Sequence, residues 1–450
     1  MQTKKKILIL GGGFGGVYAA LRLQKKLARD ADVEITLVGR ENFFLFTPML
    51  HEVAASDLEV TDIVTPIRSL LKHANFYCGD VDAIDLPNKC VTVSHGYEPH
   101  SHTLHYDFLI LALGSTTNFF KLPGVEENAV TMKSLADAIR LRNLLIDHLE
   151  EADTECASES RGGLMTFVVA GGGFAGIETI ASVNDFVRDS LKFYPYVRPA
   201  DVKVIVAHPG DVILPELGPE LGAYAQGKLR ERGIEVLTRT KVSAATAQGV
   251  TLSDGRHVPC RTLIWTAGTA PHPILGTLPC RCDRGRVVVN EFLEVEGWPG
   301  VYAVGDCAVV PDARTGKPHP PTAQHALREG RVAADNLVAA IRGGRKKPFD
   351  FVTLGQLAAI GHRTGVAKVF GLKFSGFIAW WLWRTIYLAK LPSLEKKVRV
   401  AISWTLDLLF PRDLVRFMGA AHAPVSHTDH EDEHTHAGAV ASEGRALAVA

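Results

Sequence analysis

Two glycine-rich segments have the residue types and the spacing to bind the pyrophosphate of a dinucleotide. They are GGGFGG at residues 11–16 and GGGFAG at residues 171–176, and each contains G-x-G-x-x-G. In this pattern the first glycine permits a tight turn, the second lets the pyrophosphate approach the backbone, and the third lets a helix pack closely on a strand. Two chance matches in one chain are improbable, so the sequence predicts two dinucleotide-binding sites.

Each motif lies between elements that would position it. Apolar runs at residues 7–10 and 166–170 precede the glycines and are typical of buried parallel strands. Helical patterns follow the glycines, and VEITLV (33–38) and VKVIVA (202–207) are the next predicted strands. The N-terminus of each helix offers N–H groups and a positive dipole end to an anion. Two dinucleotides in one chain suggest electron transfer between them, most commonly from a nicotinamide to a flavin.

Three later segments carry further candidates. YDFLILALGS (106–115) and GVYAVGDCA (300–308) are predicted apolar strands that end in small-residue turns, and Asp306 follows Gly305 in the second. An acid at such a strand end can hold a sugar or ribityl hydroxyl. PPTAQHALREGRVAADNL (320–337) is predicted to form a helix whose first-turn N–H groups point at the same ligand.

Composition limits the alternatives. A chain of 450 residues can hold two or three domains, and its N-terminal MQTKKK runs into the first strand without the apolar segment of a signal peptide. Seven cysteines are scattered without a C-x-x-C motif, which suits a reducing cytoplasm and predicts no metal site. The formal net charge is zero, and no nucleic-acid partner is expected.

The order of these motifs along the chain resembles that of a known family. G-x-G-x-x-G, A-x-G-S, a second G-x-G-x-x-G followed by x-E, W-T-A-G, G-D and A-Q succeed one another, as in flavoproteins with two dinucleotide-binding domains. Among these, the chain resembles the type II NADH:quinone oxidoreductases, the non-proton-pumping NADH dehydrogenases, over about residues 5–418. The most specific segments are residues 42–54, 263–275, 320–330 and 374–392.

The resemblance implies a fold and a domain organisation. We expect an α/β fold with two Rossmann-like dinucleotide-binding domains, in which the NAD(P)H domain is inserted in a discontinuous FAD domain, followed by a C-terminal membrane-associating helical region. The expected ranges are 1–120 and 290–370 for the FAD-binding domain, 121–289 for the NAD(P)H-binding domain, 371–418 for an amphipathic membrane-contacting region, and 419–450 for a disordered tail rich in histidine and acid.

The resemblance also implies roles for individual residues. It implies FAD contacts for Gly11, Gly13, Phe14, Gly15, Gly16, Arg40, Pro48, Val81, Ala112, Gly114, Asp306, Ala323 and Gln324. It implies contacts with NADH, or with NADPH as a possible donor, for Gly171, Gly173, Phe174, Gly176, Glu178 and His208. The expected catalytic residues are Glu178, close to the nicotinamide and the flavin, and Gln324, facing the flavin edge and the head group of a membrane quinone. An acid near a helix N-terminus also offsets the helix dipole, so a structural role for Glu178 stays open.

Two positions depart from the family pattern. The strand after the first motif ends in Gly39 and Arg40, where an acid usually holds the adenosine ribose, and Glu41 lies nearby. The corresponding strand after the second motif ends in His208, where members of the family often carry glutamate. Because a missing acid removes repulsion against a 2′-phosphate, NADPH becomes possible as a donor.

The C-terminal part has a composition suited to a membrane surface. Residues 374–392 are mostly apolar, but Arg384 and Lys390 interrupt them, so the run is too short and too charged to span a bilayer. Residues 394–410 are predicted to form an amphipathic helix. Residues 371–418 contain eight lysines and arginines against three acids, and four of the six tryptophans. This pattern favours contact with an anionic membrane, although a core helix pair or a homodimer interface would also account for it.

These observations predict an FAD-dependent enzyme, peripheral on the cytoplasmic face of the inner membrane. It would pass hydride from NAD(P)H to FAD and two electrons to a membrane quinone without proton pumping. The alternatives are a sulfide:quinone oxidoreductase, a soluble NAD(P)H reductase of the same fold, and a non-catalytic flavin-binding membrane sensor. A sulfide:quinone oxidoreductase needs two cysteines beside the flavin, and Cys156 and Cys307 are the plausible pair.

Overall fold

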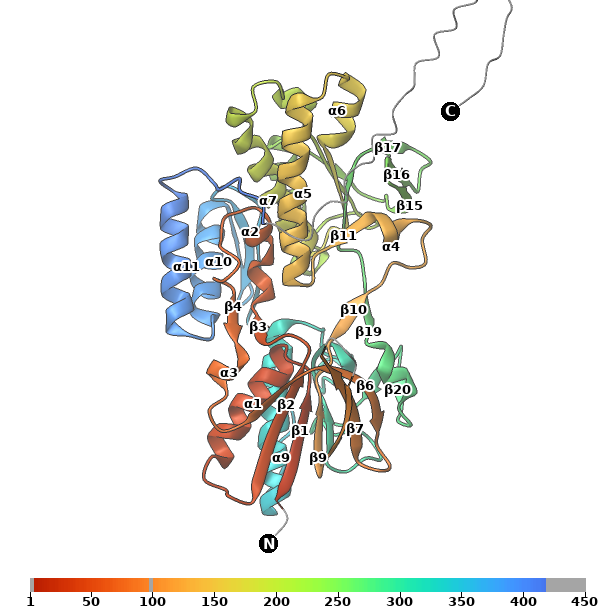
Figure 1. Cartoon of the computed structure of the whole chain (residues 1–450), viewed down its shortest axis with the longest axis vertical. Helices are drawn as coiled ribbons and strands as arrows, with labels where there is room; N and C mark the ends of the chain where they lie inside the picture. Colours follow the sequence, from red (N-terminus) through yellow and green to blue (C-terminus); the bar gives the residue numbers. More distant parts are fainter. Residues whose placement is uncertain (1–3, 97–99, 418–450) are drawn as a thin grey trace, which may run out of the picture. The chain divides into compact units, whose positions relative to one another are not determined.

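Two parallel β-sheets of the same design form the framework of the chain. The computed structural model describes residues 4–96 and 100–417 (Figure 1). The first sheet consists of β1 (Lys5–Leu10), β2 (Val33–Gly39), β5 (Asn75–Cys78), β9 (Phe108–Leu111) and β22 (Val301–Ala303). The second consists of β11 (Ala129–Thr131), β12 (Thr166–Ala170), β13 (Lys203–Ala207), β14 (Ile234–Leu237) and β18 (Thr262–Trp265). The strand orders are β22-β9-β1-β2-β5 and β11-β18-β12-β13-β14, so the strand before each glycine motif is central in its sheet.

Each sheet is built from the same succession of elements. A helix, α1 (Phe14–Leu27) or α7 (Phe174–Ser190), follows the central strand and leads to a second strand in parallel register. After the third strand comes an antiparallel three-stranded sheet, and the chain then returns as the fourth strand. These inserted strands are β6 (Asp80–Asp85), β7 (Cys90–His95) and β8 (His100–His105), and β15 (Val242–Thr246), β16 (Gly249–Leu252) and β17 (His257–Pro259).

Two short antiparallel strands carry the chain between the two sheets. β10 (Ser115–Thr117) comes after β9, β19 (Thr269–Pro271) comes after β18, and the two pair with each other. The second sheet is therefore inserted into a connection of the first, which confirms the predicted α/β class with two Rossmann-like units. The domain boundaries at residues 120, 289 and 370 stay predictions. The remaining short strands are β3 (Phe43–Leu45), β4 (Val64–Pro66), β20 (Cys282–Asp283), β21 (Arg286–Val288) and β23 (Ala308–Val309).

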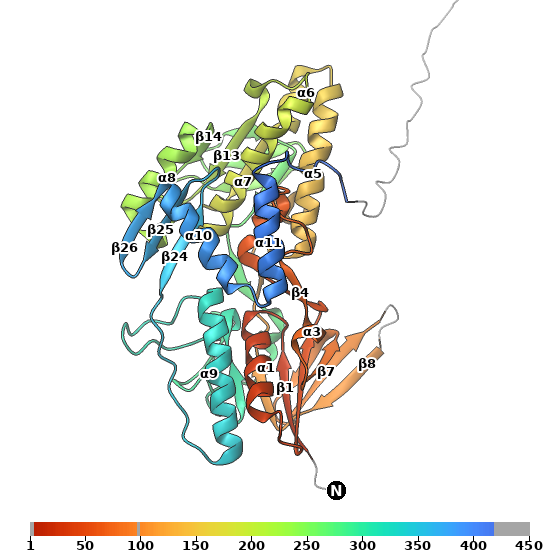
Figure 2. The same cartoon turned by 90° about the vertical axis from the view of Figure 1, so that its left-hand side faces the viewer.

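Helices α1 and α9 (Ala323–Arg342) lie side by side (Figures 1 and 2). Gly330 permits this packing, because a Cβ atom there would overlap the carbonyl oxygen of Gly15. The guanidinium of Arg22 on α1 also donates two hydrogen bonds of 2.8 Å to the carboxylate of Asp335 on α9. The other helices before the C-terminal part are α2 (Leu50–Ala54), α3 (Ile67–Leu70), α4 (Val125–Asn128), α5 (Leu135–Thr154), α6 (Ser158–Leu164) and α8 (Pro219–Glu231).

The C-terminal part contains an antiparallel sheet and two helices. The sheet consists of β24 (Gly355–Ala359), β25 (Gly365–Val369) and β26 (Leu372–Ser375), and α10 (Gly376–Lys390) packs on it (Figure 2). Helix α11 (Leu394–Asp407) follows, which confirms the helix predicted at residues 394–410 and ends it three residues earlier. No helix within residues 4–96 or 100–417 is long and apolar enough to cross a bilayer. The predicted tail at residues 419–450 lies outside the described residues.

Helix α11 buries Lys396, Val400 and Trp404 against the protein and turns several apolar side chains outward. The ammonium group of Lys396 is buried and donates to a backbone carbonyl oxygen (2.6 Å), and the hydroxyl of Ser403 donates to the buried Asp62 (2.8 Å). Val398 and Ile402, on the opposite face, are 51% and 54% exposed. A helix on an ordinary protein core turns most of its apolar side chains inward. The outer face of α11 therefore presents apolar side chains that the chain itself does not cover.

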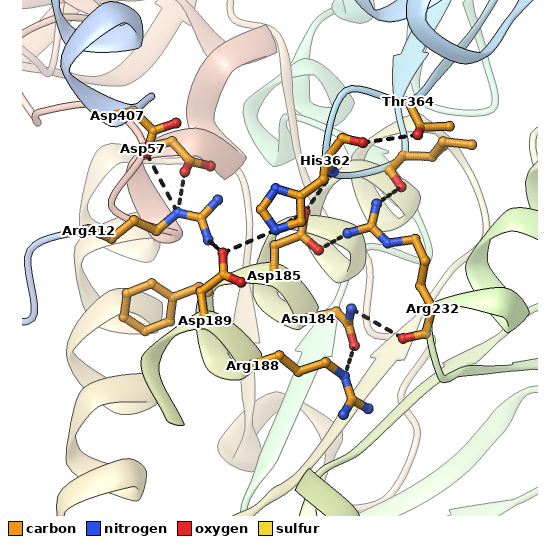
Figure 3. A network of polar contacts seen from close by, with 12 residues as sticks. Asp57, Asn184, Asp185, Arg188, Asp189, Arg232, His362, Thr364, Asp407 and Arg412 are labelled. Atoms are coloured by element: carbon orange, nitrogen blue, oxygen red, sulfur yellow. Dashed lines mark hydrogen bonds and ion pairs between the residues drawn. The ribbon is translucent and has the colours of Figure 1, made fainter. Parts of the chain in front are cut away.

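A network of charged side chains fastens the C-terminal part to α7 (Figure 3). The carboxylate of Asp185 on α7 forms an ion pair with Arg232 and accepts a hydrogen bond from the backbone N–H of His362 (2.9 Å). Arg412 follows α11 in the chain. It forms an ion pair of 2.8 Å with Asp189, which also lies on α7. The side chain of Asp185 is 5% exposed, so its charge depends on these partners rather than on water.

Replacing Asp185 by alanine is expected to destabilise the fold by about 3 kcal/mol, because it leaves the guanidinium of Arg232 partly buried without its partner. Chemical denaturation would measure the free energy of unfolding. Glu231→Ala, which breaks the exposed pair between Glu231 and Lys228, is the matched control and should cost less than about 1 kcal/mol. Equal effects of the two substitutions would show that the network contributes no more than a surface ion pair.

Candidate active site

The two glycine motifs fold into the same turn. Gly11 and Gly171 have φ angles of 113° and 119°, a conformation that residues with a side chain rarely adopt. At Gly16 and Gly176, a Cβ atom would overlap the carbonyl oxygen of the first glycine of the same motif. A helix can start this close to the strand only when glycine occupies both positions, which is the role that the sequence predicts for them.

The middle glycine of each motif faces open space. Gly13 and Gly173 are the N-cap residues of α1 and α7, and neither helix has a side-chain cap. A Cβ atom added at either glycine would meet no atom within 4 Å. The first-turn N–H groups of each helix therefore border a space that suits an anion, with Phe14 or Phe174 as the first helical residue. Both turns fit the pyrophosphate of a dinucleotide.

In each sheet, the backbone that follows the fourth strand is hydrogen-bonded to the last residue of the central strand, next to the glycine turn. The N–H of Ala112 donates to the carbonyl oxygen of Leu10 (2.8 Å), and the N–H of Thr266 donates to that of Ala170 (2.9 Å). Ala112 and Thr266 thus occupy equivalent positions, directly after the fourth strand of each sheet. Sequence analysis assigned Ala112 but missed Thr266, whose hydroxyl also donates to Ala170 (2.9 Å). The repetition of a small-residue turn, ALGS and TAGT, after both strands is the signal that could have identified it.

Asp306 lies in a 3₁₀ turn (Gly305–Cys307) after β22. The hydroxyl of Ser115 donates to its Oδ2 (2.7 Å), and Nζ of Lys133 donates to both oxygens of Ser115 (2.8 Å each). Burial lowers the pKa of Lys133, and the charge of Asp306 opposes that shift. Oδ1 of Asp306 can accept a hydrogen bond from a ligand hydroxyl. Neither Ser115 nor Lys133 was predicted, because their contact with Asp306 joins distant parts of the chain.

Helix α9 is fastened to the turn that carries Asp306. The N–H of Gly305 donates to the carboxyl of Glu329 on α9 (2.7 Å), and burial raises the pKa of Glu329 to about 7. A Cβ atom at Gly15 would approach Val304 at the end of β22 to 2.9 Å. The first glycine turn, Asp306 and the start of α9 therefore meet at one end of the first sheet. Gly114, two residues after Ala112, has open space around it and a φ angle of 68°.

The other expected FAD contacts lie around this group. Pro48 belongs to a 3₁₀ turn (Thr47–Met49) directly after Phe46, and the Phe46 ring centroid is 5.9 Å from that of Phe14. The segment with Pro48 therefore borders the start of α1.

Arg40 and Val81 lie near the end of β2. The N–H of Gly79 donates to the carbonyl oxygen of Gly39 (3.0 Å), which brings the start of β6 with Val81 close to that strand end. Arg40 is exposed, and its Nε lies 3.9 Å from the carboxylate of Glu41. Glu41 is thus an exposed carboxylate next to the position where the family usually has its acid.

His208 packs over the second glycine turn. The N–H of Gly172 donates to its Nδ1 (3.2 Å), and a Cβ atom at Gly172 or Gly210 would come within 2.7 Å of the ring. Burial lowers the pKa of His208, so the imidazole is neutral near pH 7. Sequence analysis missed two neighbours: Arg239, whose N–H donates to Gly210 (3.0 Å), and Asp211, which pairs with the Arg239 guanidinium (2.5 Å).

Gln324 follows Ala323 in the first turn of α9. Its Nε2 donates to the carbonyl oxygen of Gly355 on β24 (3.3 Å), and its backbone carbonyl oxygen accepts a hydrogen bond from the guanidinium of Arg328 (2.7 Å). The N-cap residue Thr322 makes no side-chain cap. The N-terminus of α9 can therefore face a ligand with its N–H groups, while β24 holds the amide of Gln324.

Glu178 is buried on α7, just beyond the second glycine turn. Its Oε1 accepts hydrogen bonds from the indole N–H of Trp383 (2.8 Å) and the backbone N–H of Ala359 (3.2 Å). Burial raises the pKa of Glu178 to about 8, the two hydrogen bonds lower it, and the charge of Glu52 raises it. The carboxyl therefore holds a proton near neutral pH, and a neutral acid does not offset the helix dipole.

The C-terminal part contacts both expected catalytic residues through β24, which bonds Gln324 at its first residue and Glu178 at its last. Because four residues of a strand span about 13 Å, the backbone groups of β24 that make these two contacts lie about that far apart. The sequence gives no sign of this contact. The prediction that the tryptophans are interfacial is wrong for two of them. Trp383 and Trp404 are buried, whereas Trp381 is exposed. A buried indole and an interfacial one give the same sequence signal.

The seven cysteines are free thiols. Cys156 is exposed, whereas Cys307 is buried with its thiol directed at two backbone carbonyl oxygens, those of Leu111 and Val304. These environments do not favour the pair of cysteines that a sulfide:quinone oxidoreductase would need.

Comparison with known proteins identifies the family. Residues 5–330 match the model of the pyridine nucleotide-disulphide oxidoreductase family, and residues 354–413 match that of the NDH2 C-terminal domain. The probable NADH dehydrogenase of Dictyostelium discoideum is 33% identical, over 92% of this chain and 91% of that protein. The type II NADH:quinone oxidoreductase Ndh of Mycobacterium tuberculosis is 31% identical, over 91% of this chain and 89% of that protein.

A solved structure has the same fold. The structure of NDH2 from Plasmodium falciparum in complex with NADH superposes with a TM-score of 0.85 at 22% identity, covering 92% of this chain and 100% of that one. The second family match covers β24 to α11, the part that contacts Glu178 and Gln324. The chain belongs to the type II NADH:quinone oxidoreductases, within the pyridine nucleotide-disulphide oxidoreductase family.

Proposed function

We propose that the chain oxidises NADH, and also NADPH, and passes two electrons through FAD to a membrane quinone without pumping protons. One observation carries this proposal. The same dinucleotide turn is built twice, and β24 links the helix of the second turn to the helix that faces the first. Such an arrangement can hold two dinucleotides and a third ligand around one set of residues. The enzyme would act at the cytoplasmic face of the inner membrane.

We assign FAD to the first turn and the nicotinamide dinucleotide to the second. The first turn has Asp306 for a ribityl hydroxyl, and it meets the N-terminus of α9. When bound, FAD supplies the acceptance of hydride and the delivery of two electrons. The residues of the chain hold the dinucleotides in a fixed mutual orientation and exclude water, which accounts for a large part of the rate.

Gln324 and Glu178 are assigned to the quinone end of the site. The amide of Gln324 is half-buried and oriented by β24, so it can donate a hydrogen bond to a quinone carbonyl. Glu178 holds a proton in a buried place between α7 and the C-terminal part. A quinone needs both a hydrogen-bond donor and a proton as it becomes a quinol.

The donor site favours tolerance of a 2′-phosphate. His208 is neutral and bonded to the turn, so no carboxylate occupies the strand end itself. Arg239 can pair with a phosphate, and Asp211, which pairs with Arg239, can accept hydrogen bonds from ribose hydroxyls. The site thus offers Arg239 to the 2′-phosphate of NADPH and Asp211 to the ribose hydroxyls of NADH.

The exposed apolar face of the C-terminal part is proposed to lie against an anionic membrane. Its most exposed members are Phe370, Leu372, Phe377, Ile378, Trp381, Leu394, Val398, Ile402, Leu406, Leu408, Leu409 and Phe410. The polar contacts of Lys396 and Ser403 already hold α11 from the other side. A surface helix with this orientation can bury its apolar side chains only in lipid or in another protein, such as a second copy of the chain.

Gln324→Leu is expected to slow reoxidation of the reduced enzyme by quinone at least tenfold, because the amide donor is lost. Reduction by NADH should change less than twofold. Stopped-flow absorbance separates the two half-reactions, and Gln248→Leu, at an exposed position, is the control. An equal loss in both half-reactions would argue against the assignment.

The wild-type enzyme is expected to use NADPH within about tenfold of NADH in kcat/KM, a gap of roughly 1.4 kcal/mol in transition-state binding. His208→Glu should restore preference for NADH by adding a repelling carboxylate. Arg239→Ala should lower kcat/KM for NADPH and leave that for NADH within twofold. A wild-type preference for NADH of a thousandfold or more would overturn this view of the donor site.

A variant with Trp381→Ser, Ile402→Ser and Leu409→Ser is expected to sediment at least tenfold less with vesicles of anionic phospholipid, because each exposed side chain contributes about 1.5–3 kcal/mol when buried. Tyr196→Ser, at a residue 69% exposed outside this face, is the control. Unchanged sedimentation would rule out this face as the membrane contact. Loss of a dimer in light scattering without lipid would identify it as a subunit interface instead.

A further inference from the structure

A second buried acid, Glu52 on α2, lies beside Glu178. Its Oε2 accepts a hydrogen bond of 3.0 Å from the indole N–H of Trp404 on α11. The neighbouring His51 places its Nδ1 4.0 Å from Oε2 of Glu178, and its ring contacts the edge of Trp383 at 5.5 Å between centroids. Two carboxyls and an imidazole therefore form one buried cluster, of which the proposed function uses only Glu178.

The cluster borders a cavity of about 720 Å³. His51 and Glu52 contribute to one wall, and α7 and residues 407–412 contribute to the others. Exposed side chains outside the apolar face described above, such as Phe193, also line the cavity, so water can enter it.

The charged network of Figure 3 lines the same space, with Asp57, Asp189, His362 and Arg412 among its members. The cavity thus connects solvent with a buried acid through a series of polar groups.

We propose that this cavity is the route by which protons enter the quinone site, and that Glu52 takes up each proton and passes it toward Glu178. The proposal rests on the proposed function. Oxidation of NADH to NAD⁺ releases two electrons and one proton, as hydride, whereas reduction of a quinone to a quinol takes two electrons and two protons. One proton must therefore come from water in each turnover. At Glu52 an O–H bond forms with the incoming proton and breaks when the proton leaves, and no electrons are transferred.

Charged groups on several elements face Glu52. Burial is the largest influence and raises its pKa to about 8; the charge of Arg384 on α10 and the indole hydrogen bond lower it, while Asp57 and Asp407 raise it. Glu52 in turn raises the pKa of Glu178. Asp57, a member of the network, has a pKa raised by burial to about 6. Proton affinity therefore increases from the network toward the buried acids, which favours inward movement of a proton.

His51 precedes Glu52 on α2 and approaches Glu178, so we assign it as the carrier between the two acids. Burial lowers its pKa to about 3, so the imidazole is neutral. A neutral imidazole can accept a proton at one nitrogen while it releases another from the second nitrogen, and it carries no lasting charge. Its contact with Glu178 is 4.0 Å, close enough for a small movement to complete a hydrogen bond.

Glu52→Gln keeps the shape of the side chain and a carbonyl oxygen for the Trp404 indole, but it cannot release and regain a proton. Reoxidation by quinone should slow at least tenfold, while reduction by NADH stays within twofold of wild type. Wild-type reoxidation should slow above about pH 8, where Glu52 loses its proton. The glutamine variant should weaken that dependence to the part that Glu178 contributes, and Glu52→Asp should retain it in full. A glutamine variant with the wild-type rate and pH profile would overturn the proposal.

A measurement independent of turnover tests whether Glu52 holds the proton. Its pKa of about 8 in the folded chain exceeds the ordinary value of 4.5, so between these values the folded state binds more protons than the unfolded state. The free energy of unfolding of wild type should therefore fall as pH rises through this window. Glu52→Gln should reduce the slope by up to one proton per molecule. An unchanged slope would overturn the proposal.

A second variant tests the cavity without altering either acid. Ser182 on α7 lines the cavity, and Ser182→Phe should obstruct it and slow quinone reoxidation at least threefold. Gln248→Phe adds the same ring at an exposed position and should have no effect. A wild-type enzyme that no quinone reoxidises would refute the proposed function itself. Normal wild-type activity, with Glu52→Gln and Ser182→Phe both like wild type, would refute only the proton route.

Discussion

The hydrogen bond from the Trp383 indole to the Glu178 carboxyl joins the C-terminal part to the helix of the second glycine turn. A carboxyl at this depth would be costly without donors, and Trp383 and the N–H of Ala359 supply them from α10 and β24. The same burial keeps Glu178 protonated near neutral pH. The C-terminal part therefore completes the site, and its position decides the protonation state of a residue in the framework.

The two glycine turns show how one steric solution can serve two ligands. Their backbone geometry is the same because the contacts at Gly16 and Gly176 allow no other residue so close to the strand. What differs lies beyond the turn. The first strand end has Arg40 beside Glu41, and the second has His208 packed onto the turn itself. The differences between the two turns thus lie in residues outside the motif, which can vary without disturbing its fold.

The fold and the glycine roles could be predicted from the sequence because they arise from contacts within a strand, a turn and a helix. The partners of Glu178 could not, since Trp383 lies 205 residues away and an indole in an apolar run gives no sign of its partner. Ser115 and Lys133 were missed for the same reason. In α11 the spacing correctly separates two faces, but periodicity does not say which one is turned inward. The inner position of Lys396 depends on a carbonyl oxygen that only the folded chain places there.

The two faces of α11 explain how one element can serve the site and a surface at once. Its inner face combines the buried Val400 and Trp404 with hydrogen bonds, including that of Trp404 with Glu52. The apolar side chains remain available for lipid or a partner, and the framework does not depend on that contact. Trp404 sits on the same helix as the exposed Ile402, so α11 carries both a donor to a buried acid and part of the exposed apolar face.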